Sequence, residues 1–149
     1  MTSRTVTSHS PNETFEFGRS LGKGLERSDV LLLNGGLGAG KTLLTKGIMD
    51  ALGFDVDEVT SPSFALVNLY RTRTLDVYHI DLWRLDGSSD VKGAVGLEDI
   101  LENENGVVII EWADRLGDDD GFPAATRLTI TGDGDDPRRI EITSADRKI

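Results

Sequence analysis

Apolar runs and stretches of alternating polarity divide this chain into predicted strands. Residues 30–33 and 107–110 are apolar at every position, which is typical of strands buried on both faces of a parallel sheet. Residues 65–70 and 76–82 alternate and are separated by a short polar stretch, which predicts an antiparallel hairpin. The sheet should therefore contain both buried central strands and a paired edge.

Apolar residues at helical spacing predict helices on both sides of the first buried strand. Ser10, Pro11 and Glu13 predict a helix start with a capping box. A predicted buried stripe follows at every fourth residue: Phe17, Leu21 and Leu25. The second helix has its apolar residues at Leu44, Ile48, Ala51 and Leu52, with Gly53 in the C-cap position.

The remaining segments complete an α/β pattern. Residues 127–131 and 139–143 alternate and predict a closing antiparallel pair, whereas residues 85–95 are polar and favour a loop before a short helix at 96–101. Together these elements predict an α/β fold with a mixed, mainly parallel sheet flanked by helices.

The length sets the domain organisation. A chain of 149 residues is most simply one domain, spanning residues 1–149. Residues 4–7 alternate as a candidate edge strand, but we expect the terminal segments 1–9 and 145–149 to fray.

A glycine-rich motif follows the first buried strand. Residues 35–42 read Gly-Gly-Leu-Gly-Ala-Gly-Lys-Thr and fit the P-loop pattern of Gly, four residues, Gly-Lys-Ser/Thr. Glycines allow phosphate oxygens to approach the backbone, whose N–H groups form an anion nest at a helix N-terminus. Lys41 supplies a charge for the β- and γ-phosphates, and the Thr42 hydroxyl can bind Mg²⁺. Strand, loop and helix in this order indicate a P-loop NTPase rather than a glycine-rich turn that binds nothing.

Composition and charge narrow the possible functions. Hydrophobic residues make up 38% of the chain and charged residues 28%, as in soluble globular proteins. No apolar run is long enough for a membrane span and no secretory signal is visible, so we expect a cytoplasmic protein. Cysteine is absent, which excludes disulfides and thiolate metal sites. The net charge of −10 argues against a broad nucleic-acid-binding face, although a basic partner could contact RNA instead.

Carboxylates near the ends of predicted strands are candidates for the rest of a nucleotide site. Glu111 directly follows a buried strand, where a P-loop enzyme commonly places the acidic residue for Mg²⁺ and water. Asp81 lies between apolar residues, so it needs either a role in the site or a salt bridge to Arg84 or another arginine. For His79 no second histidine is near, and we expect a packed structural residue rather than a metal ligand.

Ser61 and Ser63 flank Pro62 after the P-loop helix. This is where other P-loop enzymes carry a switch segment that senses the γ-phosphate. Ser63 could bind Mg²⁺ or hold a water molecule, and an ordinary Ser-Pro turn is equally compatible with the residues.

Four motifs together resemble one protein family. They are residues 37–42 (Leu-Gly-Ala-Gly-Lys-Thr), 60–64 (Thr-Ser-Pro-Ser-Phe), 79–85 (His-Ile-Asp-Leu-Trp-Arg-Leu) and 110–112 (Ile-Glu-Trp). In order, spacing and chain length they resemble the TsaE (YjeE) family of bacterial P-loop ATPases, which is required for threonylcarbamoyladenosine formation in tRNA. The likeness covers most of residues 10–145. The P-loop is shared by many enzymes, whereas the other three motifs together are specific.

The resemblance implies a P-loop fold and specific site residues. It implies that Mg²⁺ and ATP bind, with Thr42 and Glu111 at the metal. It implies catalytic roles for Lys41, Asp81, Glu111, Trp112 and Ser63, where the family usually has Thr at the position of Ser63. The nucleotide-binding residues implied are Thr14, Gly38, Ala39, Gly40, Lys41, Thr42, Leu43 and Arg139, with Arg138 and Arg139 as candidates to close over the nucleotide.

The resemblance also implies a partner. In this family the complex of TsaD and TsaB transfers the threonylcarbamoyl group to adenosine 37 of tRNA, and the ATPase supports repeated turnover. Contact with tRNA would then be indirect. A small-molecule kinase of the P-loop class is the alternative, but its expected Arg-rich lid is not evident. A regulatory GTPase is the third class, and the chain has no Asn-Lys-x-Asp element for guanine.

Overall fold

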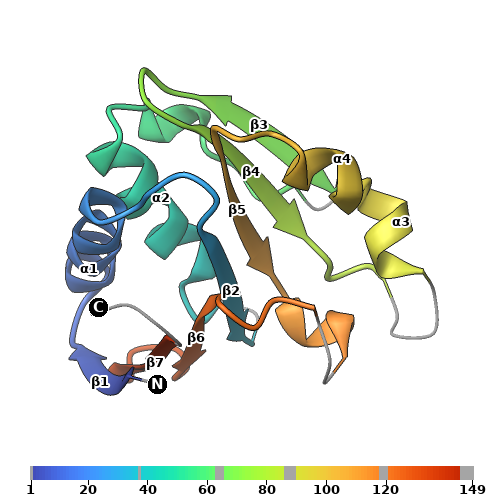
Figure 1. The fold of residues 1–149 in the computed structure, drawn as a ribbon. Helices are drawn as coiled ribbons and strands as arrows, with labels where there is room; N and C mark the ends of the chain where they lie inside the picture. Colours follow the sequence, from blue (N-terminus) through green and yellow to red (C-terminus); the bar gives the residue numbers. More distant parts are fainter. Residues whose placement is uncertain (1, 37, 63–65, 86–89, 118–120, 145–149) are drawn as a thin grey trace.

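The structure is a computed structural model that describes residues 2–36, 38–62, 66–85, 90–117 and 121–144. Within these residues seven strands form one sheet in the order β1-β7-β6-β2-β5-β4-β3 (Figure 1). The strands are β1 (Thr2–Ser8), β2 (Val30–Gly35), β3 (Val67–Arg71), β4 (Asp76–Asp81), β5 (Gly106–Glu111), β6 (Thr126–Thr131) and β7 (Arg138–Ser144).

Parallel pairs form the centre of the sheet and antiparallel pairs form both edges. Strands β6, β2, β5 and β4 are parallel neighbours. The hairpin β3–β4 lies at one edge, and β7 pairs antiparallel with both β6 and β1 at the other. The predicted mixed sheet, hairpin and C-terminal antiparallel pair are therefore confirmed.

Helices cover the sheet in two groups. They are α1 (Pro11–Lys23), α2 (Lys41–Ala51), α3 (Val91–Val95) and α4 (Leu97–Leu101), with the short 3₁₀ turns η1 (Val56–Glu58) and η2 (Ala113–Leu116). Figure 1 shows α1 beside α2, and α3 and α4 together near the β3–β5 side of the sheet. Strand β2 is buried on both faces, as its continuous apolar run predicts: Leu31 and Leu33 join the core with α2, while Leu32 joins the core with α3 and α4.

Glycines bring α1 very close to α2. A Cβ atom at Gly18 would lie 2.2 Å from the Leu44 carbonyl oxygen, and one at Gly47 would lie 2.1 Å from that of Phe15. The fully buried face of α1 is therefore Thr14, Gly18 and Gly22. The predicted stripe of Phe17, Leu21 and Leu25 is only half-buried and packs at the margin of the core. The face with Gly18 and Gly22 is the one that packs against α2, because only residues without a Cβ allow the two helix backbones to touch.

Three local predictions need correction. Residues 2–8 pair along their whole length with β7, which confirms the candidate edge strand at residues 4–7 and lengthens it where fraying was expected; residues 145–149 lie outside the described part. Part of the polar stretch at 85–95 forms α3, which Asp90 caps by accepting a hydrogen bond from the Gly93 N–H group. At the start of α1, Ser10 caps as predicted, but Glu13 accepts from the His9 N–H group, one residue before the cap.

Candidate nucleotide site

The loop between β2 and α2 has the backbone geometry that its glycines predict. Gly38 and Gly40 have φ values of 75° and 113°, a region that other residues adopt only with strain. Gly40 is the N-cap of α2 and provides no side chain to cap it, so the first N–H groups of the helix remain available at this end. An anion placed there gains both these donors and the helix dipole.

Lys41 lies on the inner side of this loop and is buried. Its ammonium group donates hydrogen bonds to the carbonyl oxygens of Gly35 at 2.6 Å and Gly36 at 2.8 Å. It also lies 4.5 Å from the ring centre of Trp112. Burial lowers the pKa of Lys41 below its usual value, while the negative charges of Glu111 and Asp81 oppose that shift. The ammonium thus sits between the phosphate loop and the carboxylates.

Two carboxylates face the loop from the neighbouring strands. Asp81 and Glu111 are register partners at the carboxyl ends of β4 and β5, where ligands bind in open α/β sheets. Both side chains are almost fully buried, with residue exposures of 4% and 2%. The Asp81 carboxylate accepts hydrogen bonds from the Ser61 hydroxyl and the Trp83 N–H group, both at 2.9 Å. Within the described part of the chain, these donors hold Asp81 rather than an arginine.

The Glu111 carboxylate has a histidine as its hydrogen-bond partner. The Nε2 atom of His79 makes a hydrogen bond to the Glu111 carboxylate, and His79 is completely buried. The other ring nitrogen, Nδ1, lies 3.1 Å from the Tyr70 hydroxyl oxygen. His79 is a packed residue, as expected, but its contact with Glu111 also connects it to the site.

Trp112 turns the chain sharply at the end of β5. Its φ of 58° and ψ of 42° lie in the left-handed region, which costs a residue other than glycine roughly 1–3 kcal/mol. The indole ring lies over Lys41 and meets Trp83 edge-on, with ring centres 6.3 Å apart. The next turn is tied to β2 because the Asp114 N–H group donates to the Asn34 side-chain oxygen at 2.9 Å. Strained backbone of this kind is typical of functional sites.

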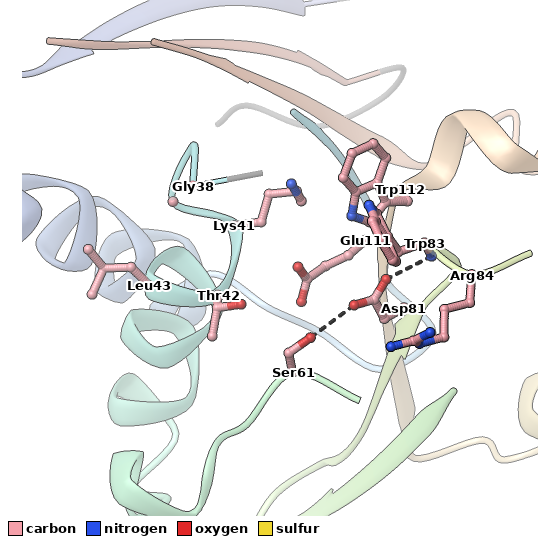
Figure 2. Close-up of a pocket in the computed structure, with 11 residues that line it drawn as sticks. Gly38, Lys41, Thr42, Leu43, Ser61, Asp81, Trp83, Arg84, Glu111 and Trp112 are labelled. Carbon is pink, nitrogen blue, oxygen red and sulfur yellow. Dashed lines mark hydrogen bonds between the residues drawn. The ribbon is translucent and has the colours of Figure 1, made fainter. Parts of the chain in front are cut away.

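These groups line one cavity of about 490 Å³. Figure 2 shows the Glu111 and Asp81 carboxylates and the Ser61 hydroxyl pointing into the space beside Thr42 and Lys41. The lining residues are Gly38, Gly40, Lys41, Thr42, Leu43, Ser61, Asp81, Trp83, Arg84, Glu111 and Trp112. The structure therefore brings together the predicted residues Gly38, Gly40, Lys41, Thr42, Leu43, Asp81, Glu111 and Trp112. Ala39 is buried within the same loop, and Ser63 lies outside the described residues.

A second cavity of about 340 Å³ shares Gly38, Gly40 and Leu43 with the first. Its other walls come from the start of α1 with the residues before it, and from residues 134–138 at the start of β7. The Thr14 and Ser8 hydroxyls are buried there and lie 2.7 Å apart. Thr14 is thus next to the loop, as predicted, because α1 packs tightly against α2.

The arginine that reaches the loop is Arg138, not Arg139. Arg138 donates to the carbonyl oxygens of Ala39 at 3.1 Å and Gly38 at 3.3 Å. The side chain of Arg139 is 62% exposed and pairs with Glu141. Successive side chains of a strand point to opposite faces of the sheet. Arg138 and Arg139 are consecutive in β7, so only one of them can point toward the loop. The structure thus places Arg138 at the loop and Arg139 away from it, and binding of the nucleotide by Arg139 stays an untested prediction.

Sequence reasoning missed three participants: Ser8, Tyr70 and the contact of His79 with Glu111. The only available signal for the contact was alternation, because residues 79 and 81 fall on the same face of β4. The pairing of His79 with β5 depends on strand register, which a single sequence does not state.

The polar groups around the cavity fit a hard divalent cation. Thr42 and Ser61 supply hydroxyl oxygens, and Asp81 and Glu111 supply carboxylates. Among the described residues, no group of three or more His, Cys, Asp or Glu side chains could form a metal cage. Mg²⁺ commonly takes only one or two protein oxygens and completes its shell with phosphates and water. The residues present therefore suit Mg²⁺ held together with a nucleotide.

Comparisons with known proteins agree on one family. A family model described as threonylcarbamoyl adenosine biosynthesis protein TsaE matches residues 8–140. The TsaE protein of Bacillus subtilis is 34% identical, over 95% of this chain and 84% of its own length. That of Treponema pallidum is 34% identical, over 85% and 92%.

A solved structure is similar along most of the chain. The crystal structure of Bacillus subtilis YdiB matches with a TM-score of 0.76 and 28% identity, covering 96% of this chain and 86% of YdiB. The described part of the chain contains no helix long and apolar enough to cross a membrane. The family match spans the phosphate loop and both carboxylates, and this chain belongs to the TsaE family of tRNA threonylcarbamoyladenosine biosynthesis proteins.

Proposed function

We propose that this chain is a Mg²⁺-dependent ATPase that supports threonylcarbamoyl modification of adenosine 37 in tRNA as an accessory subunit of the TsaD–TsaB complex. The observation that carries the proposal is the single cavity that has a phosphate-binding loop on one wall and two buried carboxylates on the other. This combination suits a triphosphate and its metal ion. Membership of the TsaE family supports the link to tRNA modification.

Each wall has its own task in this proposal. The N–H groups of the loop and the start of α2 bind the β- and γ-phosphates. Lys41 gives up its hydrogen bonds to the Gly35 and Gly36 carbonyls and donates to phosphate oxygens instead. Thr42 and Glu111 would hold Mg²⁺, and the bound ion would neutralise charge on the phosphates. Asp81, held by Ser61, orients the water that attacks the γ-phosphate.

The second cavity provides room for the rest of the nucleotide. It continues from the phosphate loop past Gly38 and Gly40 to Thr14 and Arg138. Arg138 spans the loop and the segment before β7, with a further hydrogen bond to the Gly134 carbonyl at 3.1 Å. We assign the ribose and base to this region.

The acidic charge of the chain is consistent with a partner that contacts the tRNA in its place. With a net charge of −10, the chain is poorly suited to hold the tRNA phosphate backbone itself. The TsaD–TsaB complex would contact the tRNA and stimulate hydrolysis by positioning Ser61 near the γ-phosphate. The proposal includes a cytoplasmic location, where tRNA is modified.

Reconstitution tests this proposal. The chain is added to purified TsaD–TsaB, tRNA and ATP, and both phosphate release and modified adenosine are measured over several turnovers. We expect sustained modification only with this chain, and faster phosphate release with the partner than without it. An unchanged rate and unchanged modification would reject the accessory ATPase role. Phosphate transfer from ATP to a small molecule, without release to water, would favour the kinase alternative.

A further inference from the structure

A row of hydrogen bonds runs from the exposed residue Thr60 to the buried carboxylate of Glu111. The Tyr70 hydroxyl accepts a hydrogen bond from the Thr60 N–H group at 3.3 Å, and its oxygen lies 3.0 Å from the Thr60 carbonyl oxygen. The same hydroxyl oxygen lies 3.1 Å from Nδ1 of His79, whose Nε2 is bonded to Glu111. Asn68 strengthens the outer end by donating to the Thr60 carbonyl at 3.2 Å and to the Tyr70 hydroxyl at 3.3 Å.

The neighbouring residue of the same segment holds the second carboxylate. Ser61 donates to Asp81 at 2.9 Å. Thr60 and Ser61 are therefore connected to both carboxylates of the site by two separate routes. One route passes through Tyr70 and His79 to Glu111, and the other leads directly to Asp81. A shift of this exposed segment cannot leave both carboxylates undisturbed.

We propose that Tyr70 and His79 are positioning residues that couple the Thr60–Ser61 segment to the orientation of Glu111. The proposal rests on the proposed ATPase function, in which Glu111 acts at the metal ion. A glutamate side chain has several rotatable bonds, and a fixed donor at Nε2 restricts its carboxylate. His79 is in turn fixed by Tyr70, since its other ring nitrogen has a hydroxyl partner.

Burial makes this coupling effective. Tyr70 and His79 have exposures of 5% and 0%, so water cannot easily replace a lost partner. Polar groups in such surroundings keep their hydrogen bonds or move together to new ones. Closure of the segment around a nucleotide therefore changes the position of Glu111 as well as that of Asp81. Tyr70 also contacts Phe54, with ring centres 5.0 Å apart, so its packing survives removal of the hydroxyl alone.

The substitution Tyr70→Phe removes only the hydroxyl, and Tyr78→Phe is a matched control. The Tyr78 hydroxyl also has a hydrogen bond, accepted from the Asn103 side chain at 3.0 Å, but it belongs to neither route. We expect Tyr70→Phe to lower the rate of ATP hydrolysis about tenfold, the equivalent of one ordinary hydrogen bond, with ATP affinity changed less than about twofold. Tyr78→Phe should leave both values unchanged. Equal losses in both variants, following their melting temperatures, would indicate a purely structural role and overturn the proposal.

A second measurement needs neither nucleotide nor metal. Amide hydrogen exchange at Thr60 and Ser61 is compared between wild type, His79→Ala and His79→Gln. His79→Ala breaks the row at a distance from Thr60, so we expect faster exchange at the Thr60 amide, which donates to the Tyr70 hydroxyl. Ser61 belongs to the other route, and its amide serves as the reference. His79→Gln retains an N–H donor for Glu111, and we expect it to recover part of the hydrolysis rate lost in His79→Ala.

The two proposals fail in different ways. Unchanged exchange at Thr60 in His79→Ala overturns the coupling whether or not the protein hydrolyses ATP. An inactive wild-type protein with faster exchange in His79→Ala instead rejects the ATPase function and retains the physical connection. Wild-type hydrolysis in Tyr70→Phe also overturns the positioning role.

Discussion

The two walls of the nucleotide site are built in opposite ways. The phosphate loop is local: its glycines, Lys41 and Thr42 fall within residues 35–42, and its chemistry comes mostly from the backbone. The opposite wall is assembled from Ser61, Asp81 and Glu111, which lie far apart in the chain, and its chemistry comes from side chains. Only the parallel pairing of β4 with β5 brings its two carboxylates side by side.

This difference separates binding from reaction. Backbone N–H groups offer the same donors to any polyphosphate, so the loop supplies affinity. Carboxylates add negative charge beside phosphates and are costly without a metal ion or a hydrogen-bond donor. Their burial here, each with specific donors, suits a role in the reaction rather than in binding. Substitutions in the two walls should therefore have distinguishable effects.

The largest effect is expected for Lys41→Ala, in the phosphate wall. Loss of the ammonium removes the charge that meets the β- and γ-phosphates, so ATP binding should weaken and hydrolysis should fall by about 10²–10³-fold or more. Circular dichroism should show an intact fold, because the ammonium is partly desolvated and its removal relieves that cost. Hydrolysis at the wild-type rate by a folded Lys41→Ala protein would refute the phosphate-binding role.

Glu111→Gln should affect the other wall alone. The amide keeps the size of the side chain but removes the negative charge, so we expect hydrolysis to fall by about a hundredfold. ATP affinity, measured by calorimetry, should change only a few-fold. A parallel loss of affinity and rate, as in Lys41→Ala, would erase the distinction between the two walls.

Asp81→Ala and Trp112→Ala should have smaller effects that appear mainly with the partner. Asp81→Ala leaves the Ser61 hydroxyl without its acceptor, and Trp112→Ala removes the ring above Lys41 while keeping the strained backbone. We expect tRNA modification to be blocked and partner-stimulated hydrolysis to fall at least about tenfold, with ATP binding retained. Full modification by both variants would contradict a role for these residues in coupling.

The smallest expected effect on chemistry comes from Gly47→Ala, which tests the packing that places Thr14 beside the loop. A methyl group would lie 2.1 Å from the Phe15 carbonyl oxygen and force α1 from α2, at a cost of roughly 1–3 kcal/mol or more. Gly24→Ala is a suitable control, because a Cβ atom at Gly24 would lie 3.7 Å from its nearest neighbour, the Leu21 carbonyl oxygen, and the φ of Gly24 is −96°. Thermal unfolding should separate the two variants. Equal melting temperatures would show that the helices can adjust without cost.

Local features of this molecule could be predicted from the sequence, and long-range contacts could not. The P-loop could be predicted because its glycines and lysine lie within one short stretch of sequence. Strands β2 and β5 could be predicted because each contains a continuous apolar run. Glu111 was found because it directly follows a buried strand, and Asp81 because a carboxylate between apolar residues needs a partner or a role. The contact of His79 with Glu111 depends on strand register, and the exchange of Arg139 for Arg138 depends on which face of β7 meets the loop. A one-residue change in the register of β4 would remove the first contact, and one in the register of β7 would exchange the two arginines.

A structure with Mg²⁺ and a non-hydrolysable ATP analogue tests the central claim most directly. The account predicts that Lys41 leaves the Gly35 and Gly36 carbonyls for the phosphates, and that Thr42 and Glu111 lie at the metal ion, directly or through water. The base and ribose should lie toward Thr14 and Arg138. A nucleotide bound elsewhere, or Glu111 turned away from the phosphates, would contradict a single site built from the two walls.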